Sequence, residues 1–297
     1  MAEKFVKREK LPTKSMLIGE NSITVKAALH RADTQTSTSS AVILIPGWSM
    51  EGHSRGLTKM AQSFSKSTGN TVVTISTDFP DSTSATPSKQ VVALNQYIEP
   101  FHFQSVIIVG HSEGTTNALA LAKQLESRRQ EGDQVPTVDG VVLMTPIGLT
   151  PHAPSQIVKE LGKAAFLHIP KGTVVDIAAA RRGVGKFFDA GIIGLTMAKN
   201  IARDVLQRGP RRYIRHVRQE ITNMTAQLEN HLQAPLVFAL GQHDNVVPTT
   251  SAKEQITSRF PNAHILIFDQ FGHHGMPYQQ HETIAQQSIV YIRRGRS

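Results

Sequence analysis

The strongest chemical pattern in this chain is the run Gly110-His111-Ser112-Glu113-Gly114. It follows an apolar run, Ser105 to Val109, and opens a segment with helical periodicity. A serine on such a tight strand-to-helix turn has a strained backbone, and the flanking glycines remove side chains that would clash there. The turn exposes the hydroxyl, and the N-terminus of the helix favours developing negative charge. Ser112 is therefore predicted to be a nucleophile.

The chain also supplies a base and an acid downstream of this serine. A serine hydroxyl reacts slowly at neutral pH unless a base takes its proton and an acid orients that base. Asp244 follows the apolar run Pro235 to Leu240, and His273 follows the run Ala263 to Phe268. The order serine, aspartate, histidine, each after a predicted strand, is what a serine hydrolase on a parallel sheet requires. We therefore predict a triad of Ser112, Asp244 and His273.

Each member of this triad has an alternative interpretation. Ser112 also fits a non-catalytic protein of the same fold. Asp244 also fits a turn-forming residue that caps the following helix. His274 and His243 compete with His273 for the role of the base, and the glycine that precedes His273 favours that residue.

The elements around these residues alternate between short apolar runs and longer helical patterns, which is typical of a mostly parallel sheet. Continuously apolar strands are expected where helices cover both faces of the sheet. The predicted strands are 22–31, 41–45, 71–75, 105–109, 140–144, 235–240 and 263–268, and the predicted helices are 53–66, 88–98, 112–128, 249–259 and 278–293. Active sites of such α/β sheets lie at the carboxyl ends of the strands, where the three triad residues can converge.

The interval 147–231 interrupts this alternation and is far longer than an ordinary connection between two strands. It contains 13 basic and 6 acidic residues, a net charge of +7 out of +9 for the whole chain. Two amphipathic patterns, which begin near Ile157 and Ile214, indicate helices. We interpret the interval as a helical cap inserted into a core formed by residues 1–146 and 232–297. The arginines on the other faces of the second pattern, Arg211, Arg212, Arg215 and Arg218, are interpreted first as a solvated surface.

Over about residues 15–292 the sequence resembles the alpha/beta-hydrolase family. The resemblance rests on the turn around Ser112, the Gly-x-x-Asp-x-x-x-Pro run at Asp244, the Gly-His pair at His273 and the Pro46-Gly47-Trp48 turn after the predicted strand 41–45. It implies a mostly parallel central sheet with helices on both faces and a helical cap. It does not specify a substrate.

The same resemblance implies an oxyanion hole made by the backbone N–H groups of Trp48 and Glu113. Two positions depart from the family's usual pattern. The loop that commonly begins His-Gly begins Pro46-Gly47 here, and the small residue after the last glycine of the serine turn is Thr115. The first departure leaves the conformation of the oxyanion loop open.

Composition and missing motifs exclude several other classes of protein. No cysteine is present, which excludes disulfides, thiolate metal sites and a cysteine nucleophile. No H-E-x-x-H metal pattern, phosphate loop or paired-glycine dinucleotide pattern occurs, so no metal and no cofactor are expected. Nothing resembles a zinc finger or an RNA-binding strand, so no nucleic-acid partner is expected despite the net positive charge. The first 14 residues lack the apolar core of a secretory signal, and the most apolar stretch, 190–198, is about half the length that a bilayer needs. We expect a cytoplasmic protein.

We therefore expect a serine hydrolase that cleaves an ester-type acyl bond of a small or medium-sized substrate through an acyl-enzyme. The alternatives are a non-catalytic binding protein of the same fold, and a thioesterase, acyltransferase or carbon–carbon hydrolase that uses the same triad. The basic interval 147–231 favours an anionic substrate. Its amphipathic helices fit peripheral contact with anionic lipid as well. The sequence does not indicate an oligomeric state.

Overall fold

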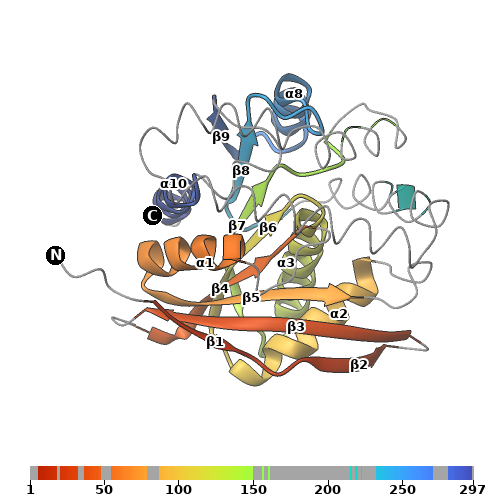
Figure 1. Ribbon diagram of the computed structural model, residues 1–297, viewed down its shortest axis with the longest axis vertical. Helices are drawn as coiled ribbons and strands as arrows, with labels where there is room; N and C mark the ends of the chain where they lie inside the picture. The colour runs from red at the N-terminus through yellow and green to blue at the C-terminus, as the bar shows by residue number, and fades with distance from the viewer. Residues whose placement is uncertain are drawn as a thin grey trace.

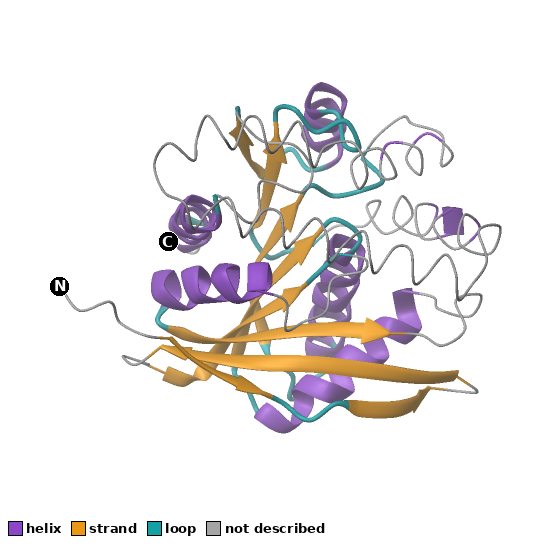
Figure 2. Cartoon of the chain, in the orientation of Figure 1, coloured by secondary structure: helices purple, strands orange, loops and turns teal. Residues whose placement is uncertain are grey.

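The computed structural model describes residues 6–18, 21–32, 37–47, 55–78, 87–149, 232–269 and 280–295, together with residues 156, 160, 215, 218, 219 and 222. Within these residues, nine strands form one sheet in the order β1-β3-β5-β4-β6-β7-β8-β9, and β2 also pairs with β3. Figure 2 shows the strands as one twisted layer between helices. Their bounds are β1 Val6–Lys10, β2 Lys14–Ile18, β3 Asn21–Ala32, β4 Ser37–Ile45, β5 Asn70–Asp78, β6 Ser105–His111, β7 Thr137–Met144, β8 Leu236–Gly241 and β9 His264–Phe268.

The sheet is parallel from β5 through β4, β6, β7 and β8 to β9, whereas β3 pairs antiparallel with β5. Every residue of β8, and every residue of β6 after Ser105, is buried. A strand that is buried on both faces needs apolar side chains on both, which is why these strands are continuous apolar runs in the sequence.

Helices cover both faces of the sheet. On one face lie α2 (Pro87–Ile98), α3 (Gly114–Gln130) and α8 (Thr249–Arg259), whose apolar residues share one core cluster with the strands. On the other face lie α1 (Arg55–Thr68) and α10 (His281–Arg294), which pack against each other and share a second cluster. Figure 1 shows the sheet between these two groups of helices. The expected α/β architecture with a mostly parallel sheet and helices on both faces is confirmed.

The five predicted helices and seven predicted strands are all present, with ends shifted by a few residues. The strands β1 and β2 were not expected. Both pair antiparallel with β3, where they form the outer edge of the sheet. Four of the five residues of β1 are charged, whereas β2 has one lysine, one serine and three apolar residues. Charged residues are common on edge strands because they discourage pairing with a further chain.

The interval 147–231 connects β7 with β8, which are neighbouring parallel strands. Most of this interval, including the two expected cap helices, lies outside the described residues. The division into core and cap therefore stays a prediction. Where the chain returns to the core, the Glu126 carboxylate of α3 accepts hydrogen bonds from the backbone N–H groups of Gln233 and Ala234, at 3.1 and 2.9 Å. Among the described residues, no helix is both long and apolar enough to cross a membrane.

Candidate active site

Ser112 lies between the end of β6 and the start of α3, at the carboxyl edge of the sheet. Its φ angle is +53°, in the left-handed region. For a residue other than glycine this conformation costs about 1–2 kcal/mol. The backbone holds it there: the Ser112 N–H donates to the carbonyl of Met144 at 2.9 Å, and the Ser112 carbonyl accepts from the Thr115 N–H at 3.1 Å and its hydroxyl at 2.5 Å. The sequence pattern therefore folds into the expected strained strand-to-helix turn. Ser112 is only 6% exposed, however, so the expected exposure of its hydroxyl is not observed.

The close approach of β6 and α3 requires the glycine that precedes this turn. A Cβ atom on Gly110 would lie 2.6 Å from the Cα of Thr115 and 2.8 Å from the Cβ of Ala118. Real Cβ atoms essentially never approach other atoms so closely, so a larger residue would push the helix away from the strand. Glycine therefore fixes the position of the first turn of α3 relative to Ser112.

The loop after β4 packs directly against the serine turn. A Cβ atom on Gly47 would lie 2.8 Å from the Cβ of Ser112, and one on Gly114 would lie 2.5 Å from the carbonyl oxygen of Ile45. Trp48, the predicted second oxyanion donor, is the next residue and lies outside the described ones. Glu113, the other predicted donor, is the cap residue before α3, with φ −58° and ψ −35°. Its backbone N–H therefore lies at the positive end of the helix dipole.

Asp244 lies just beyond β8, and its side chain is 4% exposed. Its Oδ1 accepts hydrogen bonds from the N–H groups of Val246 and Val247, both at 2.8 Å. These bonds form an Asx turn, so Asp244 does shape its own loop. It does not cap α8, because the cap position of that helix is Pro248. Both bonds use Oδ1, and neither involves Oδ2.

The sheet brings Ser112 and Asp244 to the same edge. Ser112 follows β6 and Asp244 follows β8, and one strand, β7, separates the two in the sheet. The segment that carries His273 follows β9, which is the neighbour of β8. His273 and His274 both lie outside the described residues, so the choice between them stays open. His243 is exposed beside Asp244, and His111 is buried at the end of β6.

Thr145 is a residue of this edge that no sequence pattern indicated. It follows β7, between Ser112 and Asp244, and has a φ angle of +45°. For a β-branched residue this is a rare and strained conformation. Thr145 is fully buried, and its hydroxyl has no hydrogen-bond partner among the described residues. No local sequence signal marks this position, because the strain arises from contacts between strands.

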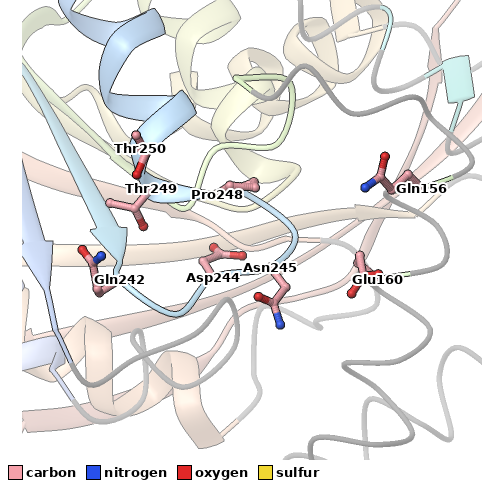
Figure 3. Close-up of a pocket in the computed structure, with 8 residues that line it drawn as sticks. All are labelled: Gln156, Glu160, Gln242, Asp244, Asn245, Pro248, Thr249 and Thr250. Atoms are coloured by element: carbon pink, nitrogen blue, oxygen red, sulfur yellow. The ribbon is translucent and has the colours of Figure 1, made fainter.

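A polar pocket of about 390 Å³ opens beside Asp244. The loop after β8 and the first turn of α8 form one side, and two residues of the interval 147–231 form the other (Figure 3). The pocket is lined by Gln156, Glu160, Gln242, Asp244, Asn245, Pro248, Thr249 and Thr250. Within the part of the chain that the structure describes, no group of three or more His, Asp or Glu side chains could hold a metal ion.

Comparison with known families and structures gives a consistent result. The model of a family described as the alpha/beta hydrolase fold matches residues 40–278. A thermophilic esterase from Thermogutta terrifontis is 15% identical, with a TM-score of 0.57 and coverage of 98% of this chain and all of its own. A bromoperoxidase from Bacillus anthracis is 15% identical, with a TM-score of 0.59 and coverage of 95% of this chain and all of its own. A bacterial membrane phospholipase A is also 15% identical, with a TM-score of 0.62 and coverage of 96% of this chain and 87% of its own. No curated protein sequence matches significantly.

Proposed function

Since this chain belongs to the alpha/beta hydrolase fold family, we propose that it is a serine hydrolase that cleaves an ester-type acyl bond of a small or medium-sized substrate. The observation that carries the proposal is the conformation of Ser112. Its strained φ of +53° is held by the backbone at the carboxyl end of β6, on the same edge of the sheet as the buried carboxylate of Asp244. Strain of this kind persists where the surrounding structure imposes it, and it is concentrated at functional sites.

In the proposed reaction, the Ser112 hydroxyl attacks the carbonyl carbon of the ester while His273 accepts its proton. The backbone N–H groups of Glu113 and Trp48 stabilise the oxyanion, and each such donor contributes about 3 kcal/mol to the transition state. The tetrahedral intermediate then releases the alcohol, which takes the proton from the imidazole. Water attacks the acyl-enzyme by the same route and releases the acid and the free serine.

Asp244 is assigned the role of orienting the imidazole. The two backbone N–H groups that bind Oδ1 fix the plane of the carboxylate, which supports a single direction for Oδ2. A carboxylate held in this way selects the tautomer of the base and stabilises the imidazolium. The turn-forming and catalytic roles of Asp244 are therefore compatible, because they use different oxygens.

We assign a small acyl compound as the substrate. The structural neighbours include an esterase and a phospholipase, and they support this assignment only through the fold that they share with this chain. The preference for an anionic substrate stays a prediction from composition. Of the 13 basic residues in the interval 147–231, only Arg215 and Arg218 are described, and neither lines the pocket beside Asp244.

The test combines turnover with covalent labelling. Wild type is expected to hydrolyse p-nitrophenyl butyrate and to react with a fluorophosphonate probe. Ser112→Ala should abolish labelling and lower kcat/KM about 10⁴-fold or more. Ser258→Ala, at an exposed serine of α8, is the matched control and should behave as wild type. Labelling that persists in Ser112→Ala would remove this serine from the mechanism.

The base and the acid are tested with the same assay. His273→Ala and His274→Ala form a pair, of which only the first should abolish turnover. Asp244→Asn should lower kcat about 10⁴-fold, because the amide stabilises the wrong tautomer of the imidazole. Comparison of butyryl esters with butyryl thioesters then separates an esterase from a thioesterase. Equal activity of all three variants and wild type would contradict the proposed triad.

A further inference from the structure

We propose that the pocket beside Asp244 binds an uncharged, hydroxyl-rich group, such as the glycerol or sugar portion of an ester. The inference rests on the proposed function, because it assigns to this pocket the alcohol portion of the ester that Ser112 attacks. The volume of about 390 Å³ is within the range of roughly 300–1,000 Å³ that small-molecule sites occupy. The pocket also lies at the carboxyl end of β8, where ligands of parallel sheets bind.

The side chains that line the pocket match hydroxyl groups in their hydrogen-bonding capacity. The side chains of Gln156, Gln242, Asn245 and Thr250 are exposed in the pocket and make no hydrogen bond to another described side chain or backbone group. Each amide or hydroxyl both donates and accepts hydrogen bonds. A ligand hydroxyl does the same, so several hydroxyls on neighbouring carbons can be satisfied at once.

The floor of the pocket is held in place by bonds that do not involve these four side chains. Asp244 binds the N–H groups of Val246 and Val247, and the buried Thr249 hydroxyl donates to the carbonyl of Gly241 at 2.6 Å. Figure 3 shows Asn245 and Thr250 on this loop and helix turn, and Gln156 with Glu160 across from them. A fixed floor reduces the entropy that a ligand must overcome when it orders the side chains around it.

The charge of the lining favours a neutral ligand over an anion. No lysine or arginine is among the eight lining residues, and their only acidic groups are Glu160 and Asp244. An anionic group would meet no cation among these eight residues to balance its charge. Hydroxyl groups, by contrast, donate readily to a carboxylate and to amide oxygens.

The position of the pocket in the sheet indicates which part of an ester it receives. The loop with Gly47 packs on Ser112 from the β4 side, whereas Asp244 lies on the β8 side. In the proposed triad the imidazole lies between Ser112 and Asp244, and it protonates the leaving oxygen. The leaving alcohol therefore lies toward β8, on the side of the pocket.

The test compares four esters that share a butyryl group and differ in the alcohol: monobutyrylglycerol, butyl butyrate, butyrylcholine and butyrylglycerol phosphate. Released butyric acid is measured by titration. Wild type should prefer monobutyrylglycerol over butyl butyrate at least about tenfold in kcat/KM. Thr250→Val and Gln242→Leu should each raise KM for monobutyrylglycerol about 3- to 10-fold, as expected for one lost hydrogen bond. Both should leave kcat/KM for butyl butyrate within about twofold of wild type.

Thr257→Val, at an exposed threonine of the same helix that does not line the pocket, is the matched control and should change the kinetics of neither substrate. An equal loss on both esters in the pocket variants would overturn the proposal. So would a wild-type preference for butyrylcholine or for butyrylglycerol phosphate that the pocket variants abolish.

Binding without turnover separates failure of this proposal from failure of the proposed function. The probe is 1-O-butylglycerol, an ether that cannot be hydrolysed, with Ser112→Ala protein and saturation-transfer NMR. Saturation transfer from Ser112→Ala protein to the glycerol protons should be lost when Thr250→Val and Gln242→Leu are added to that protein. This result supports the pocket as the binding site even if wild type does not react with the fluorophosphonate. Absence of transfer, or transfer unchanged in that pair, overturns the pocket whatever the labelling result.

Discussion

Gly47→Ala is expected to impair catalysis far more than folding. The new Cβ would lie 2.8 Å from the Cβ of Ser112 and 2.9 Å from the carbonyl oxygen of His111. Carbon atoms pack at about 3.5–4.0 Å, so Gly47 or Ser112 must move by about 1 Å. Because Gly47 is not among the glycines with positive φ, alanine fits the backbone and the effect is steric alone. A displacement of about 1 Å at a nucleophile costs on the order of 100-fold in rate, or about 2.7 kcal/mol of barrier.

The assay measures kcat/KM for p-nitrophenyl butyrate, the rate of fluorophosphonate labelling and the free energy of unfolding in urea. Gly132→Ala is the control for the substitution itself. Its Cβ would meet nothing within 4 Å, although φ is +96°, so it should lose about 1 kcal/mol of stability and no activity. Gly110→Ala, which strikes the backbone of α3, should instead destabilise the fold. A folded Gly47→Ala protein with the labelling rate of wild type would refute the inferred contact between this loop and the nucleophile.

Three further predictions concern stability, and urea unfolding tests each of them. Burial and the nearby Arg8 lower the pKa of His30 from 6.5 to about 4 in the folded protein. As the pH drops, the unfolded chain therefore binds a proton at His30 before the folded chain does. The free energy of unfolding should fall by up to about 3 kcal/mol between about pH 6.5 and pH 4. His30→Gln should flatten this pH dependence, and an unchanged slope would contradict the assignment. Thr145→Val should raise the free energy of unfolding by about 1 kcal/mol, because it removes a buried hydroxyl without a partner among the described residues; a loss of stability would show that the hydroxyl is satisfied. Glu126→Ala should cost about 1–3 kcal/mol by leaving the Ala234 N–H unpaired, whereas Glu126→Gln, which retains an acceptor, should cost less.

The central sheet was predictable because its strands are apolar on both faces and its helices are not. Continuous runs such as Ser105–Val109 correspond to buried parallel strands. The turn at Ser112 was identifiable because its flanking glycines follow such a run and precede a segment with helical periodicity. The strand β1 was not predictable, because Val6–Lys10 is almost entirely charged and shows no alternation. Its conformation depends on hydrogen bonds to β3, which are long-range and leave no local pattern.

The candidate site was predictable only in part, for a similar reason. Asp244 could be found because it follows an apolar run and lies in a turn sequence. The pocket beside it could not, because Gln156 and Glu160 are distant in sequence and polar residues in loops have no periodicity. Trp48 and His273 lie outside the described residues, so their roles remain predictions.

The backbone at the carboxyl edge links the nucleophile to the acid. The Ser112 N–H donates to the Met144 carbonyl at the end of β7, and the Thr145 N–H donates to the Ala239 carbonyl of β8, both at 2.9 Å. These bonds continue the sheet ladder from β6 through β7 to β8 and include two residues with positive φ, Ser112 and Thr145. A local relaxation of either residue would break a bond to the neighbouring strand, which costs free energy comparable with the strain itself. The ladder therefore keeps both residues strained, and in doing so it fixes the distance between the serine and the strand that carries Asp244.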